Sequence, residues 1–297
     1  MAYQIGIPYV LTGPDGTRVV FNDRTDPDFI GFLDPDTGIT GLDSPEVREN
    51  ADTLVEADGG INGNNYYGRR PIILNGMIDP NADIQTVNTR GDRLMAAADA
   101  MKGDAILTWT ETGRVQTMLR LRRQQPPRLS GRLPKVFQVP LVSEYDRIVS
   151  ASEQSVVIVP GAAISAGGFS SLLTSPLTSS YSVVGQQVIT NQGRKSAHWR
   201  ARIDGPCVNP VIQNASTGQQ IKIIYTLNTG EWLDLETRPG KRYLKLNGTA
   251  SRWGAIDFAN STFFELNANG TTQINFQPFS YSAGAQLTVY WRHTWIS

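Results

Sequence analysis

The last third of the chain is a series of short apolar or alternating runs separated by turn signals. Residues 221–225 and residues 287–291 are two such runs. Runs of about five residues between turns that recur every ~8–12 residues are typical of an antiparallel β-sandwich or barrel. The turn signals are Gly205-Pro206, Thr217-Gly218, Thr229-Gly230, Pro239-Gly240, Asn247-Gly248, Asn260-Ser261, Asn269-Gly270 and Ala283-Gly284.

The first half of the chain alternates in the same way around one helical segment. Residues 3–33 predict two or three strands, residues 40–65 a long surface loop, and residues 66–78 a return to strand. Residues 89–102 predict a helix, with Thr89 as N-cap and Gly103 as the closing residue. The spacing of Leu94, Ala97, Ala98 and Met101 gives that helix one narrow apolar stripe.

A β-hairpin is predicted after the helix, with strands at residues 105–110 and 115–122 around a turn at Gly113. Arginine alternates with leucine in the second strand, so one face should be basic and the other apolar. Residues 135–142 predict another strand. Residues 161–187 are rich in Gly, Ser, Thr and Ala, and are a linker-like loop or an excursion from the following domain.

A chain of 297 residues is long enough for two domains. We expect an N-terminal domain at residues 1–147 and a C-terminal domain at residues 148–297. The predicted fold class is mainly β, all-β with one short helix. The first domain is then a β-sandwich with one helix and a β-hairpin, and the second is an antiparallel β-sandwich.

Formal net charge is zero, which removes a simple electrostatic argument for nucleic acid or an anionic membrane as partner. The charges are nevertheless uneven, with acids gathered in residues 1–68 and bases in residues 111–147. Either each run is a solvated face, or copies of the chain attract each other head to tail. In the second case the expected contact pairs the bases with the acids: Arg114, Arg120, Arg122, Arg123 and Arg132 with Asp34, Asp36, Asp43 and Glu46.

Targeting and redox signals are sparse. Cys207 is the single cysteine, so an internal disulfide is not possible, which fits folding in a reducing cytoplasm. The N-terminus lacks the basic and apolar regions of a signal peptide, and no run approaches the ~18 apolar residues of a membrane span. We expect a soluble, unprocessed protein.

The residues of catalysis and metal binding are also sparse. The two histidines, His198 and His293, are far apart in sequence and each neighbours a tryptophan, which is typical of partly buried sheet residues. Asp234 and Glu236 share one strand face beside Arg238, where a solvated face is the ordinary interpretation. We expect no enzyme activity, no catalytic or metal-ligating residue, and no cofactor.

Carbohydrate binding is the alternative function, because sugar sites stack aromatic faces against sugar rings. The candidate glycan-facing aromatics are Trp199, Trp232 and Trp253. Tryptophans in alternating strands are more often core residues than platforms. On this alternative the chain is an adhesion protein whose C-terminal sandwich binds a host glycan.

Several short sequence motifs, taken in their order along the chain, suggest a family. They are residues 205–214, Thr217-Gly218, Gly230-Glu231, residues 246–248, residues 263–266, Gly270 and residues 289–296, together with residues 67–76 before a helix and a hairpin. This order resembles the distal tail protein of long-tailed, non-contractile phages, and is most similar to the minor tail proteins of phages of actinobacteria. The resemblance covers most of the chain but has no catalytic motif.

The resemblance implies a structural virion protein at the phage tail tip, assembled in the host cytoplasm. Six copies would form a hub ring through their N-terminal domains and join the tail tube to the tip or baseplate. A galectin-like C-terminal sandwich would mount receptor-binding proteins for host attachment. The implied partners are further copies, the tail tube protein, the tail-tip hub protein and the tape measure protein, with no direct contact to nucleic acid or membrane.

Overall fold

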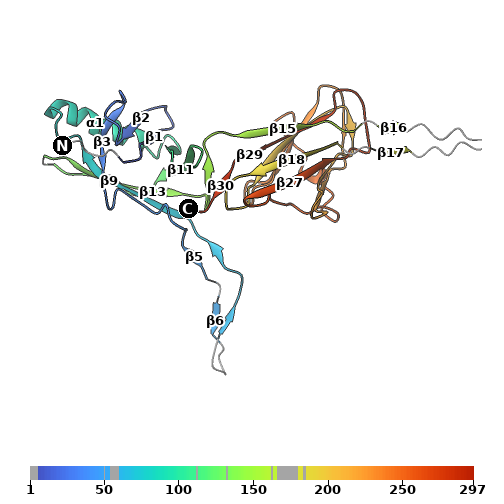
Figure 1. Ribbon diagram of the computed structural model, residues 1–297, viewed down its shortest axis with the longest axis horizontal. Coiled ribbons are helices and arrows are strands. Elements are labelled where there is room, and N and C mark those ends of the chain that lie inside the picture. Colours follow the sequence, from blue (N-terminus) through green and yellow to red (C-terminus); the bar gives the residue numbers. More distant parts are fainter. Residues whose placement is uncertain are drawn as a thin grey trace, which may run out of the picture. The chain divides into compact units, whose positions relative to one another are not determined.

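A computed structural model describes residues 6–49, 51–53, 60–111, 113–131, 133–161, 163–165, 180–182 and 185–297. The chain divides into two compact units (Figure 1). Unit 1 comprises Met1–Ala151 and Trp295–Ser297, and unit 2 comprises Ser152–Thr294. The described residues are mainly β with one α-helix, as the sequence predicts. The functional roles assigned to residues 1–147 and 148–297 remain a prediction.

Unit 1 contains the helix and about half of the strands. Its elements are β1 (Tyr9–Thr12), β2 (Arg18–Phe21), β3 (Phe29–Leu33), β4 (Ile39–Thr40), β5 (Val47–Arg48), β6 (Ala51–Thr53), β7 (Gly60–Asn62), β8 (Tyr66–Tyr67), β9 (Arg70–Ile78), α1 (Ile84–Ala97), β10 (Ala105–Trp109), β11 (Thr117–Arg123), β12 (Arg128–Leu129), β13 (Val136–Ser143), β14 (Ile148–Ser150) and the end of β30 (Thr294–Trp295).

The main strands of unit 1 close on themselves. They follow the order β13-β9-β3-β2-β1-β10-β11, and β11 pairs β13 again through Arg122 opposite Val142. Where the sequence predicts a β-sandwich, the strands of this unit form one closed, barrel-like sheet. Closure leaves fewer unpaired strand edges. The core that it encloses includes fully buried Leu11, Phe21 and Leu74.

The predicted hairpin is confirmed. β10 and β11 pair antiparallel over five residues, from Ala105 opposite Leu121 to Trp109 opposite Thr117. Leu119 and Leu121 are buried in the core, whereas Arg120 lies exposed on the outer face. The alternation of leucine with arginine thus follows the period of two along a strand.

Helix α1 begins and ends about five residues before its predicted bounds. Asp83, not Thr89, is the N-cap, and its carboxylate accepts a hydrogen bond from the Thr86 amide at 2.9 Å. This bond and the one from the Thr86 hydroxyl lower the pKa of Asp83. The helix ends at Ala97, so Met101 lies outside it and is 91% exposed. The buried stripe is Val87, Gly91, Leu94 and Ala97.

The segment predicted as a long loop at residues 40–65 contains two short ladders. β5 pairs β8, and β6 pairs β7, so the segment is in part a hairpin between β4 and β9 (Figure 1). Periodicity could not reveal strands of two or three residues. Most of the Gly/Ser-rich segment 161–187 lies outside the described residues; within it, β16 (Ala163–Ser165) pairs β17 (Ser180–Ser182).

Unit 2 is built from strands with one 3₁₀ turn. Besides β16 and β17, its elements are β15 (Gln154–Ile158), β18 (Gly185–Asn191), β19 (Trp199–Asp204), β20 (Cys207–Val208), β21 (Val211–Asn214), β22 (Gln220–Lys222), β23 (Thr226–Leu227), β24 (Trp232–Glu236), β25 (Tyr243–Leu246), β26 (Ala250–Ser251), η1 (Trp253–Ala255), β27 (Gly270–Phe276), β28 (Ser280–Tyr281) and β29 (Gln286–Trp291).

Two antiparallel sheets share the core of unit 2. One has the order β15-β29-β19-β24-β25-β26 and the other has the order β18-β27-β21-β22. Ile203 and Leu235 from the first sheet and Ile212 and Phe276 from the second are all buried in one cluster. The predicted antiparallel sandwich is confirmed, and its galectin-like detail remains a prediction.

Several of the predicted turns use positive φ. The clearest is Asn247-Gly248, which joins β25 to β26 with φ of 51° and 74°. Two consecutive positive φ angles match the right-handed twist of the paired strands, and Asn followed by Gly adopts them at low cost.

Arg70, at the start of β9, holds together the separate segments of unit 1. Its side chain is fully buried, and it donates hydrogen bonds to the backbone oxygens of Gly41 (3.0 Å), Leu42 (2.8 Å), Asp43, Asp146 (2.9 Å) and Ile296. Burial lowers the pKa of this guanidinium, while the nearby carboxylates of Asp146 and Asp43 act in the opposite direction. The side chain therefore ties the β4–β5 segment and the C-terminus to the sheet.

We expect Arg70→Met to destabilise unit 1 by ~2–4 kcal/mol, because it leaves several buried carbonyl oxygens without a donor. Arg70→Lys should recover only part of this loss, since three ammonium donors cannot reach all five oxygens. The control is Arg69→Met at the exposed neighbouring position. Chemical denaturation measures the free energy of unfolding, and equal values for Arg70→Met and Arg69→Met would contradict the assignment.

Cys207 gives a second prediction, for unit 2. The thiol is 2% exposed, and burial raises its pKa to about 11. Near pH 8 it should stay protonated and react with a disulfide reagent only through opening of the sandwich. The control is Ser216→Cys in a Cys207→Ala chain, because position 216 is exposed. The control should react within the mixing time and Cys207 far more slowly; equal rates would show that the sandwich does not protect the thiol.

Candidate assembly surface

The outer face of β9 and β13 is largely apolar. The two strands pair antiparallel over eight residues, with Ile72, Leu74 and Val139 turned into the core. Side chains of the opposite parity therefore face outward. We call these outward residues the outer strip: Pro71, Ile73, Asn75, Met77, Val136, Gln138, Pro140 and Val142.

The outer strip carries no charge, and part of it is open to solvent. Met77 and Val136 are directly opposite each other and are 39% and 48% exposed. Asn75 and Gln138 also lie opposite each other and bond through their amides at 3.1 Å. Apolar side chains on both faces of a strand pair are typical of strands that are covered on both sides, so the outer strip is a candidate contact surface.

Arginines border the outer strip on one side. Arg122 of β11 lies opposite Val142, and Arg128 of β12 lies opposite Gln138. Arg120 is two residues from Arg122 on the same strand face, and it is exposed. A basic border beside an apolar strip is the usual anatomy of a protein–protein interface, in which charges lie at the rim.

The predicted interface arginines differ in their surroundings. Arg114 contacts its own unit: it pairs with Glu111 at 3.1 Å, donates to the Ser297 carbonyl at 2.9 Å and lies over the Trp295 ring. Arg122 pairs with Asp104 at 2.8 Å. Within the described part of the chain, Arg120 and Arg123 have no ion pair. Arg132 lies outside the described residues.

The predicted acidic partners lie between β3 and β9. Asp34 accepts hydrogen bonds from the backbone amides of Thr37 and Asp36, and these bonds hold the pKa of its carboxyl below the ordinary value. Asp36, Asp43 and Glu46 are exposed. The Asp34 carboxylate therefore already stabilises its own turn. A contact between these acids and the arginines of a second copy remains a prediction.

Of the three tryptophans predicted to face a glycan, one is buried and two are partly exposed with packing contacts. Trp199 is 1% exposed, and its indole N–H donates to the Phe264 carbonyl at 2.9 Å, so its assignment as glycan-facing is wrong. Trp232 is covered on one side by the Arg202 guanidinium, 4.4 Å from the ring centre. Trp253 packs against Phe258 and Phe263.

The two histidines are held by structural contacts. His198 Nδ1 lies 3.3 Å from Glu265 Oε1, and His293 Nδ1 accepts a hydrogen bond from the Gln192 amide at 3.2 Å. Burial lowers the pKa of His293. Among the described residues, no group of three His, Cys, Asp or Glu side chains could hold a metal ion. The helix in the described ranges falls short of the length and apolar character of a membrane span.

The outer strip was missed in the sequence, although its signal is present. Residues 71–74 and 139–142 are continuous apolar runs, in which both strand faces are apolar, and a half-buried strand would show strict alternation. That these two runs pair with each other depends on a sheet order that local pattern does not specify.

Comparison with known proteins now adds to this geometry. Residues 192–295 match the family described as siphovirus-type tail component, C-terminal domain. The chain is similar in structure to the Dit protein of phage SPP1, described as a paradigm of the hub adsorption apparatus in phages that infect Gram-positive bacteria. That match has a TM-score of 0.61 and 12% identity, and covers 96% of this chain and 98% of that chain.

A chain of the phage P2 baseplate, in an activated conformation with calcium, also matches over 96% of this chain and 97% of its own. Its identity is 10% and its TM-score 0.43, too low to carry an argument. No curated protein matches. The predicted resemblance is thus confirmed: residues 192–295 match the model of the siphovirus-type tail component C-terminal domain, and the chain has a Dit-like fold over 96% of its length.

Proposed function

We propose that this protein is a structural hub at the distal end of a phage tail. Six copies would form a ring that joins the tail tube to the tail tip or baseplate. The observation that carries the proposal is a Dit-like fold over almost the whole chain, together with the family match in unit 2.

The outer strip supports assembly through unit 1. An apolar strip on one copy that meets a different surface on the next gives a heterologous contact, and such contacts close into a ring when the rotation permits. Arg120 and Arg123 have no ion pair among the described residues, so their charges remain available to a neighbouring copy. Charged rims of this kind set register and association rate more than affinity.

The remaining partners follow from the same proposal. The ring would contact the tail tube protein on one side and the tail-tip hub and tape measure proteins on the other. Unit 2 would mount receptor-binding proteins. The protein would assemble in the host cytoplasm and end in the virion, at the tail tip.

Light scattering over a range of concentration and salt tests the ring directly. We expect a sixfold mass, either alone or after addition of purified tail tube protein. A chain that stays monomeric at every concentration, with and without tail tube protein, would overturn the proposal.

Reversal of the two free charges should weaken the ring. We expect Arg120→Glu/Arg123→Glu to raise the dissociation constant about tenfold, or ~1.4 kcal/mol, at physiological salt, with a smaller effect at high salt. The control is Arg69→Glu/Lys241→Glu, which changes net charge equally at two exposed positions. Sedimentation velocity measures both, and an unchanged ring in the first variant would remove these arginines from the contact.

A charge within the outer strip should act differently. Val136→Glu places a carboxylate where the proposed contact excludes water, so the dissociation constant should rise by at least about tenfold with little dependence on salt. Met101→Glu is the matched control, because Met101 is exposed apolar surface outside the strip. If both variants assemble like the original chain, the strip is not the contact between copies.

A further inference from the structure

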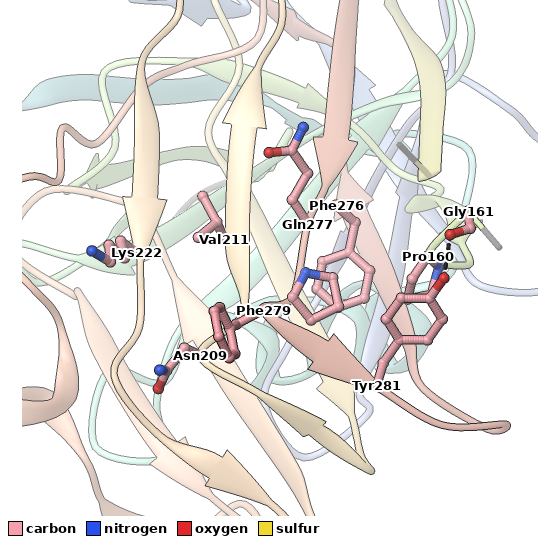
Figure 2. Close-up of a pocket in the computed structure, with 10 residues that line it drawn as sticks. Pro160, Gly161, Asn209, Val211, Lys222, Phe276, Gln277, Phe279 and Tyr281 are labelled. Carbon is pink, nitrogen blue, oxygen red and sulfur yellow. Dashed lines mark hydrogen bonds between the residues drawn. The ribbon is translucent and has the colours of Figure 1, made fainter. Parts of the chain in front are cut away.

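Unit 2 has a pocket of about 490 Å³ at one end of its four-stranded sheet (Figure 2). Its lining includes the rings of Phe276, Phe279 and Tyr281 and the polar side chains of Asn209, Gln277 and Lys222. In the view of Figure 2, the Phe276 ring lies between those of Phe279 and Tyr281. The volume is within the range of about 300–1,000 Å³ that is common for small-ligand sites.

Two of the pocket's aromatic rings, those of Phe279 and Tyr281, are exposed but held in place, whereas Phe276 is buried in the core of unit 2. Phe279 is 85% exposed, although its backbone amide donates to the Val208 carbonyl at 2.9 Å. The Tyr281 hydroxyl donates to the Gly161 carbonyl, and the ring is 38% exposed. An ordered backbone that presents a phenylalanine to water indicates a binding surface.

The polar side chains of the pocket contribute no net charge, because two are amides and the third, Lys222, is paired with a carboxylate. The Lys222 ammonium lies 3.5 Å from the Asp257 carboxylate, which offsets its charge. The side-chain amides of Asn209 and Gln277 have no hydrogen-bond partner among the described residues, although both backbone amides do. Each side-chain amide offers both donors and an acceptor. The pocket therefore favours a ligand that is uncharged and both donates and accepts hydrogen bonds.

A row of amides runs across the sheet next to the pocket. Gln186 of β18 lies opposite Asn275 of β27, Asn275 opposite Gln213 of β21, and Gln213 opposite Gln220 of β22. We call these four residues the amide row. Directly opposed residues share a sheet face, so one side chain from every strand of this sheet contributes to the row.

The amide row and the pocket are continuous. Gln277, Val211 and Lys222 lie two residues along their strands from Asn275, Gln213 and Gln220, and a step of two keeps the same face. The described side chains of the row and the pocket include no Asp or Glu. The surface is therefore a neutral track that ends in an aromatic pocket.

We propose that this surface binds a neutral saccharide chain. One sugar unit packs its C–H face against Phe279 or Tyr281 in the pocket, and its hydroxyls bond to the amides of Gln277 and Asn209. Adjoining units lie along the amide row. An anionic sugar finds no unpaired cation there, and an apolar peptide would leave the amides unsatisfied. The site does not depend on ring formation, so either proposal can fail alone.

Saturation-transfer NMR on the full chain tests the site. The probes are maltose, cellobiose, lactose and N,N′-diacetylchitobiose, with N-acetylneuraminic acid and a proline-rich decapeptide for comparison. At least one neutral disaccharide should bind, and the acidic sugar and the peptide should not. If none of the four binds at up to about 10 mM, where a Kd of about 1 mM would give near saturation, the proposal fails. Binding of only the acidic sugar or the peptide would overturn it as well.

Variants then locate the site. Phe279→Ala should weaken the bound disaccharide about tenfold and Gln277→Ala about threefold, since both side chains are exposed and fold-neutral. The controls are Phe258→Ala and Gln192→Ala, an exposed phenyl ring and an exposed amide outside the pocket. Both should bind within about twofold of the original chain. Equal losses in variants and controls would place any sugar elsewhere.

Discussion

Unit 1 depends on the hydrogen bonds that the buried guanidinium of Arg70 donates to backbone oxygens. A lone buried charge would be costly, yet here five backbone oxygens from three separate segments surround it. One of them belongs to Ile296, after the chain has passed through the whole of unit 2. Trp295 enters the same core at 6% exposure. Unit 1 is therefore built from residues on both sides of unit 2, which is an insertion between Ala151 and Trp295.

Closure of the sheet has a second consequence. Once β11 pairs β13, the apolar residues of one parity are enclosed, and those of the other parity are forced outward. Along β9 and β13 these outward residues are still apolar. A strand pair that stayed alone in water would gain nothing from Met77 and Val136 at its surface, and it is this exposed apolar pair that the proposed contact between copies would cover.

Local sequence pattern predicted the parts of the fold that depend on local physics. The hairpin of β10 and β11 and the Asn247-Gly248 turn need only neighbouring residues, so their signals are complete in the sequence. The start of α1 was missed because the N-cap Asp83 is followed three residues later by Thr86, not by the acidic residue of a capping box. Thr89 followed by Asp92 has the capping-box spacing, although both lie inside the helix. β5 and β8 are two residues each, too short for any period to show.

The candidate sites were less predictable because they are assembled from distant segments. The outer strip needs the pairing of residues 70–77 with residues 136–143, and the pocket of unit 2 joins Gly161, Asn209, Lys222 and Tyr281. Aromatic residue type alone pointed to tryptophans, and large rings in alternating strands are drawn into the core, as Trp199 shows. The most exposed ring of the pocket belongs to Phe279, which lies on the short connection between β27 and β28, where strand periodicity gives no signal.

The two surfaces differ in a way that fits different ligands. The outer strip is apolar with an arginine border, and such a surface gains from excluding water over a broad contact with another protein. The amide row is uncharged and rich in paired donors and acceptors, and it gains little from burial against a protein that lacks matching groups. Hydroxyl-rich chains supply those groups at each sugar unit. A hub whose first unit assembles and whose second unit touches a neutral glycan would hold both properties in one chain, and because the core clusters of the two units share no residue, each surface can change in sequence without loss of the other.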